Sequence, residues 1–458
     1  MIRRLLGNSR KLDLTEGNTV RNIWALALPM MLGNIMQTAF NVVDMIWVGR
    51  LGSEAIASVA MSGVVLFVII TLIIGVSTGT QTLVARFMGA GKCADAENVA
   101  MQSLIIGAVL SVALAGAGLI LARPILQILG AKTMILQLGT DYLKIILIGG
   151  LGMVYLFLAC AIFRASGDAL TPMLIMIGAT ILNVILDPLM IFGIGFPRMG
   201  VKGAALATVL SRGLAALLGL YILFRGSSRL RLHLAKLQAN IKTIARIVKI
   251  GFPNSIQMAS RSIVGLVLMA IVARYGSYAI AAYGIGLRIF SVVLMPGFAL
   301  ATSAAILVGQ NLGARKFLRA QTSARQAAGF NTLLMGLAGI LFFTFSANLI
   351  SVFDTNPDIV KLGAEYLKIT SFGYIFVAQG LVLGRSLMGA GDTISPMLIS
   401  VFALLGIQIP LAVILPNHLH IGISGVWWAI LISSVLQGAL TCFWFNLGRW
   451  KGIDNLRI

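Results

Sequence analysis

The amino-acid sequence predicts an all-α integral membrane protein in which twelve transmembrane helices form two pseudo-symmetric lobes of six helices each, as a parallel repeat. Three observations predict this fold class. The mean hydropathy is +0.97, and 59% of the 458 residues are hydrophobic while only 11% are charged, which lies outside the range of soluble globular chains. Apolar runs long enough to cross a bilayer as helices recur along the chain. The second half of the chain also repeats the first.

The apolar runs give twelve predicted spans. Strand-like alternation is absent from them, so helices are the expected form. In chain order they cover residues 22–48, 57–80, 95–121, 135–161, 170–193, 201–224, 247–273, 282–306, 324–347, 360–384, 395–415 and 422–446. The predicted domains are a cytoplasmic tail, an N-lobe, a basic cytoplasmic linker, a C-lobe and a second cytoplasmic tail, at residues 1–21, 22–224, 225–246, 247–447 and 448–458.

The net charge of +21 first suggests nucleic acid as a partner. Most of the Lys and Arg residues, however, fall in the tails and in the loops on one predicted side of the membrane, as the positive-inside rule expects. The densest block, residues 225–249, is suited to contact with anionic lipid head groups. We therefore expect a monomer in the plasma (inner) membrane with both termini cytoplasmic, and no nucleic-acid partner.

The repeat appears when the sequence is shifted on itself by 224 residues. The matches include "RLGSEAIA" (50–57) with "RYGSYAIA" (274–281), "DYLKI" (141–145) with "EYLKI" (365–369), and "SGDALTPMLI" (166–175) with "AGDTISPMLI" (390–399). At a shift of 222, "GVKGAALA" (200–207) meets "GISGVWWA" (422–429). Six spans in each copy make the two repeats parallel, which is an architecture of secondary transporters. Such proteins bind substrate between the lobes and expose it alternately to each side.

Nearly all of the 14 acidic residues fall in loops, in tails or toward the ends of predicted spans. Two carboxylates remain within spans, Asp44 in the first and Asp187 in the fifth. A charge at that depth costs about 2.5–3.5 kcal/mol, so such residues are usually functional. The face of the first span that carries Asp44 also carries Asn34, Gln37 and Asn41.

In the fifth span Asn183 lies one helical turn before Asp187, and Pro188 frees a backbone carbonyl nearby. Thr208 in the sixth span would add a hydroxyl group to the same interior. We expect these residues to face one another inside the first lobe.

The two acids are present in only one copy of the repeat. The 224-residue shift places Asp44 on Leu268, and the 222-residue shift places Asp187 on Ile409. Because a requirement of the scaffold would recur in both copies, this asymmetry favours a specialised site.

The chemistry of this site suits a small cation. Burial disfavours a charged carboxylate, and two carboxylates in one site disfavour each other's charge, so the pair would be able to share a proton. The same oxygen-rich set would also ligate a hard metal ion. The sequence thus predicts either a proton or Na⁺ at Asp44, Asn183, Asp187 and Thr208. No organic cofactor and no catalytic residues are expected.

Three further residues are candidates. Arg261 lies midway along the seventh predicted span with Gln257 one turn before it. Arg261 is either a cavity residue or an internal partner of a carbonyl or carboxylate group. Pro29 in the first span is a candidate hinge because its ring removes a backbone hydrogen bond.

At these residues the chain resembles the multidrug and toxic compound extrusion (MATE) family. The resemblance covers residues 20–448, and its most specific motifs are "LALPMMLGNIMQTAFNVVDMIWVGRLG" (26–52) and "LNVILDP" (182–188). It implies a cation-coupled exporter of amphipathic organic cations. The chain looks most like the DinF-type and archaeal branch. That resemblance implies that the residues which couple the cation to transport are Asp44, Asp187, Asn183 and Thr208. The acid that NorM-type members carry in the seventh span is absent from "PNSIQMASRSIVGLVL" (253–268).

The predicted function is therefore secondary active multidrug export, in which amphipathic cationic organic compounds are exchanged for protons or Na⁺ by alternating access. A flippase for lipid-linked precursors, from the wider superfamily, is the alternative within transport, and Arg261 is the residue that suggests it. A membrane-embedded enzyme is a third reading, but the spans contain no His or Cys cluster that would support it. A passive channel is disfavoured because duplicated lobes form a midplane cleft more readily than a continuous pore.

Overall fold

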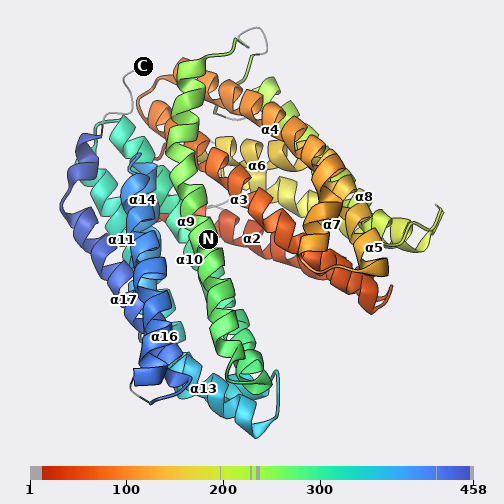
Figure 1. Cartoon of the computed structure of the whole chain (residues 1–458). Coiled ribbons are helices and arrows are strands. Elements are labelled where there is room, and N and C mark those ends of the chain that lie inside the picture. Colours follow the sequence, from red (N-terminus) through yellow and green to blue (C-terminus); the bar gives the residue numbers. More distant parts are fainter. Residues whose placement is uncertain (1–12, 196, 227–228, 234–237, 419, 454–458) are drawn as a thin grey trace. The chain divides into compact units, whose positions relative to one another are not determined.

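The computed structural model describes residues 13–195, 197–226, 229–233, 238–418 and 420–453, and all the regular secondary structure in these ranges is helical (Figure 1). Within them, ten helices are long and apolar enough to cross a membrane, and two bent helix pairs supply one further span each. The all-α fold class and its twelve spans are therefore confirmed. Residues 1–12 and 454–458, which belong to the two predicted tails, lie outside the described ranges.

The helices of the first repeat follow the predicted spans closely. They are α2 (Thr19–Gly49), α3 (Ser53–Gly89), α4 (Cys93–Ile128), α5 (Thr133–Ile148), α6 (Gly150–Ala165), α7 (Leu170–Phe192) and α8 (Val201–Arg225). Capping acids help to start some of them. For example, Asp168 accepts a hydrogen bond of 2.9 Å from the backbone N–H of Thr171 at the start of α7.

The helices of the second repeat are α9 (Ile241–Ala273), α10 (Ser277–Gly313), α11 (Phe317–Thr344), α12 (Ser346–Ser351), α13 (Pro357–Ser371), α14 (Tyr374–Gly389), α15 (Ile394–Val401), η3 (Phe402–Gln408), α16 (Ile409–His418), α17 (Ser424–Asn446) and η4 (Arg449–Gly452). The short stretch η3 is a π-helix in the middle of a span. Asp392, the repeat counterpart of Asp168, likewise accepts a hydrogen bond of 3.1 Å from the N–H of Ser395.

One span in each repeat is bent, although hydropathy predicts it as a single run. Helices α5 and α6 meet at 51°, and helices α13 and α14 meet at 54°. The bends lie at Gly149 and at Gly373, which the 224-residue shift relates. A Cβ atom at Gly149 would lie 2.3 Å from Cγ1 of Val209, so glycine allows the bend to pack directly against α8.

The described chain forms two compact units, and we treat each by itself. Unit 1 contains residues 28–252, and unit 2 contains Leu14–Ala27 together with Pro253–Arg457. Two helices therefore begin in one unit and continue in the other. Each change of unit falls beside a proline, Pro29 in α2 and Pro253 in α9, and these prolines are repeat counterparts. A proline removes one backbone hydrogen bond from a helix, so both helices are weakened where they change unit.

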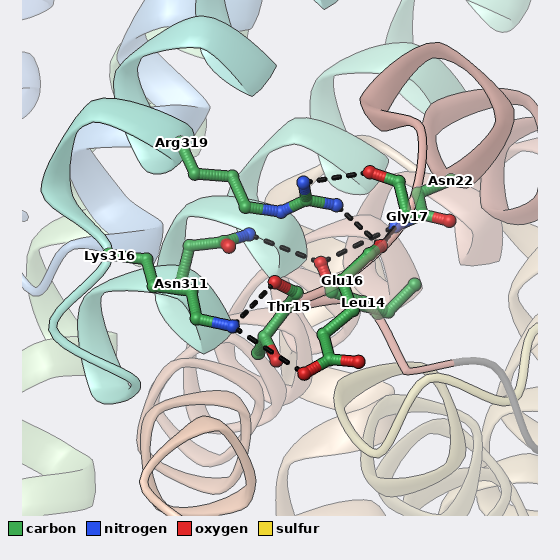
Figure 2. Close-up of polar contacts among 8 residues, drawn as sticks. All are labelled: Leu14, Thr15, Glu16, Gly17, Asn22, Asn311, Lys316 and Arg319. Carbon is green, nitrogen blue, oxygen red and sulfur yellow. Dashed lines mark hydrogen bonds and ion pairs between the residues drawn. The ribbon is translucent and has the colours of Figure 1, made fainter.

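Residues 14–17, which precede α2, are bound to unit 2 by side chains from α10, from α11 and from the turn between them (Figure 2). Arg319 donates hydrogen bonds to the carbonyl oxygens of Gly17 at 2.8 Å and Glu16 at 2.5 Å. Lys316 donates to the carbonyl oxygen of Thr15 at 3.0 Å. These bonds satisfy backbone carbonyl groups of a segment that has no regular structure of its own.

Unit 1 contains the reciprocal arrangement for the segment that precedes α9. Gln102 in α4 donates to the carbonyl oxygen of Gln238 at 2.7 Å and accepts from the N–H of Asn240 at 2.9 Å. Nearby, Glu97 accepts a hydrogen bond of 2.7 Å from the N–H of His233. The first helix of each repeat is thus preceded by a segment that is fixed to the other repeat, through α10 and α11 for the segment before α2 and through α4 for the segment before α9.

Candidate cation and substrate sites

Helix α7 places Asn183 and Asp187 on one face, as their four-residue spacing predicts. Both side chains are fully buried. The amide Nδ2 of Asn183 donates a hydrogen bond of 3.0 Å to Oδ1 of Asp187. This bond satisfies one carboxylate oxygen of Asp187.

Six buried side-chain oxygen atoms in unit 1 have no hydrogen-bond partner among the described residues: those of Ser77 and Thr140, and four that belong to the predicted cation site. The four site atoms are Oδ1 of Asp44, Oδ1 of Asn183, Oδ2 of Asp187 and Oγ1 of Thr208. Buried polar groups in proteins are nearly always paired, and each exception calls for an explanation. Oxygen atoms alone are a donor set suited to a shared proton or a hard cation, so the residues present fit such an ion. Asp44 and Asp187 also lie close enough for their charges to interact.

Two residues that the sequence reasoning missed belong to this cluster. Arg212 follows Thr208 by one turn of α8, and its charge interacts with that of Asp44. Its guanidinium group lies 4.9 Å above the ring of Phe40, and no ion pair within 4 Å joins it to a described carboxylate. Tyr142 in α5 is 5% exposed and interacts electrostatically with both acids. A search for basic residues inside the spans would have found Arg212.

A cavity of about 130 Å³ in unit 1 lies beside this cluster, and Arg212 lines it. Helix α2 contributes Pro29, Asn34 and Gln37 to its wall. Asn41, by contrast, is exposed and accepts a hydrogen bond of 3.4 Å from Gln37. The polar residues predicted for one face of the first span therefore lie in different surroundings. Asn34 and Gln37 line the cavity, Asn41 is exposed, and Asp44 is buried.

The wall of the unit 1 cavity carries positive charge. Arg164 lines it as well as Arg212, and none of the described residues along it is an Asp or Glu. The Nε atom of Arg164 is buried without a hydrogen-bond partner in the described chain. Such a wall suits an anionic or neutral polar group better than a cation.

The remaining two candidates lie in unit 2. Gln257 in α9 donates hydrogen bonds to Oγ of Ser400 at 2.6 Å and to the carbonyl oxygen of Pro396 at 3.1 Å. Arg261, one turn later, lines a cavity of about 230 Å³. The positions related to Asp44 and Asp187 are Leu268 and Ile409, so unit 2 has no second acid pair.

Comparison with known proteins identifies the family. The model of the MatE family matches residues 29–189 and 253–414, once in each repeat. The chain is 29% identical to the "Probable multidrug resistance protein YoeA" of Bacillus subtilis (strain 168), over 90% of this chain and 91% of the relative. It is 30% identical to the "FAD transporter" of Shewanella oneidensis, over 92% of both chains.

Solved structures agree with this assignment. The structure described as "Crystal structure of MATE in the bent conformation" is similar to this chain with a TM-score of 0.90 and 27% identity, over 95% of this chain and 96% of the solved one. The family model covers more than half of the sequence and both repeats. The chain therefore belongs to the MatE (multidrug and toxic compound extrusion) family, and it is a multi-pass membrane transporter rather than an enzyme.

Proposed function

We propose that this protein exports small organic molecules in exchange for a cation by alternating access, and that the cation is held by Asp44, Asn183, Asp187 and Thr208. The observation that carries the proposal is the set of four buried oxygen atoms without partners, one from each of these residues. A buried polar atom left unpaired costs about 1–3 kcal/mol. A bound cation or proton would remove that cost, so its arrival and departure can bias the equilibrium between two conformations.

The charges around Asp44 support a proton as the coupling ion. The formal charges of Asp44, Asp187 and Arg212 sum to −1, so one monovalent cation neutralises the cluster. A metal ion ligated by Asp44 would be repelled by the guanidinium group of Arg212, whose charge already interacts with Asp44. A proton shared by the two carboxylates neutralises the excess charge without needing further ligands. We therefore propose one proton per transport cycle, with Na⁺ as the alternative.

The substrate class that we propose is amphipathic organic molecules. Three Met side chains and one Phe line the unit 1 cavity, namely Met30, Met173, Met176 and Phe157, and such side chains adapt to ligands of varied shape. The relative from Bacillus subtilis is named as a multidrug resistance protein. The organic cations that the family resemblance implies fit this cavity poorly, however, because Arg164 and Arg212 lie in its wall. The relative named as an FAD transporter supports cargo of the opposite charge.

The arrangement in the cell is also a proposal. We propose a monomer in the plasma membrane with both termini cytoplasmic, in which residues 22–224 and 247–447 act as the two moving lobes. The excess of Lys and Arg in the tails and in the linker at residues 225–246 supports this orientation.

Transport by purified protein in proteoliposomes tests the proposal. A pH gradient and a Na⁺ gradient are imposed separately, and the movement of ethidium and of fluorescein is followed by their fluorescence. We expect the pH gradient alone to drive accumulation of a substrate and the Na⁺ gradient alone to drive none. Accumulation driven only by Na⁺ would replace the proton by Na⁺ in the mechanism. Equilibration of dye that no gradient accelerates would contradict coupled transport altogether.

A further inference from the structure

The largest of the membrane-embedded cavities described above, about 230 Å³, lies within unit 2, where α9, α10, α13, α14, η3 and α17 meet. It is larger than an apolar cavity of about 150 Å³, which is sufficient to bind benzene. A compound with two fused rings would therefore fit it. Neither the proposed cation site nor the unit 1 cavity uses any of its lining residues.

This cavity lies at the place in the second repeat that corresponds to the acid cluster of unit 1. Three of its lining residues, Leu268, Tyr366 and Ile430, are the repeat counterparts of Asp44, Tyr142 and Thr208. The tyrosine is kept in both copies, whereas the carboxylate and the hydroxyl group are replaced by aliphatic side chains. None of the described residues along the cavity wall is an Asp or Glu. The second copy therefore lacks the groups that suit a cation.

Among the described residues, Arg261 is the one charged side chain that lines this cavity. Arg261 lies twelve residues before the end of α9, and its side chain is exposed to the cavity. It forms no hydrogen bond or ion pair with any residue in the described ranges. A charge inside a membrane span is costly and normally pairs with an opposite charge or faces a water-filled cavity. The counterpart of Arg261 in the first repeat is Gln37, so the positive charge is not a shared need of the scaffold.

The rest of the wall is rich in aromatic rings. Five of them line it, Tyr283, Phe290, Tyr366, Tyr374 and Phe376. Contacts among the rings hold them in place: the centroids of Phe290 and Tyr374 are 4.9 Å apart, and Tyr283 packs edge-on against Tyr366 at 5.8 Å. Fixed aromatic rings favour a flat aromatic ligand, because such rings stack or meet edge to face.

The π-helix η3 borders the same cavity. It interrupts a membrane span between α15 and α16, and it contributes Leu404 and Gln408 to the cavity wall. Short π-helical segments are rare and are found frequently at functional sites. The corresponding stretch of the first repeat, in α7, is an ordinary α-helix. The irregular backbone therefore coincides with the copy of the site that carries Arg261.

We propose that the unit 2 cavity binds an aromatic organic anion, whose ring system packs among the five aromatic side chains and whose carboxylate, sulfonate or phosphate group is held by Arg261. The guanidinium group supplies paired N–H donors for such an anionic group. Only the view that this ligand is transported cargo rests on the function proposed above. Binding itself can be measured without a membrane gradient, so failure of the two proposals can be told apart.

The test measures binding of two probes with the same ring and opposite charge to the full-length protein in detergent. The probes are naphthalene-2-sulfonate and a naphthyl-trimethylammonium ion, and heats of binding are recorded by titration calorimetry. We expect the sulfonate to bind about tenfold or more tightly than the ammonium ion, because a hydrogen-bonded charge contact has that magnitude. Equal affinities, or tighter binding of the cation, would overturn the proposal.

Variants then locate the binding. Arg261→Gln should weaken binding of the sulfonate about tenfold or more and leave binding of the ammonium ion unchanged, while Arg261→Lys should retain part of the affinity. Arg274→Gln, a matched change of an exposed arginine just beyond the same helix, should have no effect. Thermal unfolding checks that each variant is folded. Unchanged sulfonate binding in folded Arg261→Gln would refute the assignment. Competition by phosphatidylglycerol that depends on Arg261 would show a lipid ligand and refute the aromatic one.

Discussion

At the scale of single residues, the candidate cation site of unit 1 combines buried oxygen atoms with a nearby positive charge. The oxygen atoms of Asp44, Asn183, Asp187 and Thr208 lack partners, and they are suited to accept a proton or cation. Arg212 connects this cluster to the neighbouring cavity, because it lines the cavity and interacts with Asp44. A change in the charge of Asp44 therefore changes its electrostatic interaction with Arg212 in the cavity wall.

A prediction at this scale concerns Arg212. We expect Arg212→Gln to reduce gradient-driven transport about tenfold or more, because it leaves two carboxylates without the nearby positive charge that balances one of them. Arg212→Lys should restore part of the activity since it keeps the charge. Arg225→Gln changes an arginine at the end of the same helix, where it contacts Tyr221 instead, and serves as the matched control. Normal coupled transport by folded Arg212→Gln would show that this arginine is only a packing residue.

The sequence predicts some of these residues better than others. Asp44 and Asp187 stand out because a carboxylate in an apolar run is rare, and the spacing of Asn183 to Asp187 defines their common face. Arg212 stands out less, because the long apolar stem of an arginine is compatible with apolar neighbours along a span. The hydrogen bond of Asn41 to Gln37 depends on side-chain rotamers, which sequence spacing does not determine.

At the scale of helices, the bends at Gly149 and Gly373 depend on close packing. Hydropathy reports the length of an apolar run but not its direction, so the sequence predicts each of these as one span without its bend. The bend angles of 51° and 54° are nearly equal, and the glycines are related by the repeat. The bend is therefore a property of the fold that existed before the duplication.

Substitution at Gly149 tests this packing. A Cβ atom there would lie 2.3 Å from Cγ1 of Val209, so we expect Gly149→Ala to lower the free energy of unfolding by about 1–3 kcal/mol through overpacking. The second change Val209→Ala should recover part of the loss in a double-mutant cycle. Gly150→Ala is the matched control, because a Cβ atom there has no neighbour within 4 Å. Equal stability of the two single variants, measured by thermal unfolding, would contradict the role of Gly149.

The sequence does not predict which helices bind the segments that precede α2 and α9. Residues 14–17 have neither an apolar pattern nor a charge pattern that names α10 or α11 as their partner. Lys316 and Arg319 bind the backbone carbonyl groups of this segment, and every residue has such a group. By contrast, the 224-residue shift alone shows that Pro29 and Pro253 are repeat counterparts.

Hydrogen–deuterium exchange tests how firmly the first of these segments is held. Arg319→Gln removes two hydrogen bonds to the carbonyl oxygens of Glu16 and Gly17. We expect residues 14–17 to exchange about tenfold or more rapidly, since each such bond contributes about 1 kcal/mol. Arg325→Gln, on the same helix, loses a bond to Asn446 instead and should leave that segment unchanged. Identical exchange in both variants would mean that other contacts hold the segment.

At the scale of the whole molecule, the two repeats of six spans differ in their buried acids. Unit 1 carries Asp44 and Asp187, and unit 2 carries Arg261 in the corresponding region with no acid in its cavity wall. The sequence shows the duplication, and it shows directly that the two acids are present in one copy alone. It does not show that Leu268, Tyr366 and Ile430 share one cavity, because that depends on how the helices pack.

The orientation of the molecule in the membrane gives a further prediction. In a variant without native cysteines, Lys242→Cys places a thiol on the exposed start of α9, within the basic block 225–249. We expect this thiol to react with a membrane-permeant maleimide and to be protected from an impermeant one in intact cells, because a segment rich in Lys and Arg stays cytoplasmic. Rapid labelling by the impermeant reagent would reverse the proposed orientation.

The central claim is that the charge of Asp44 couples the cation to transport. It is tested most directly by transport of Asp44→Asn protein in proteoliposomes under an imposed pH gradient, with Glu54→Gln, an exposed acid at the start of α3, as the control. The amide imitates the neutral acid, so we predict a folded protein that still binds substrate but loses accumulation driven by the gradient. Asp187→Asn should behave alike, and the double variant should be little worse than either, because the two acids act as a unit. Near-normal accumulation by folded Asp44→Asn protein would contradict the account.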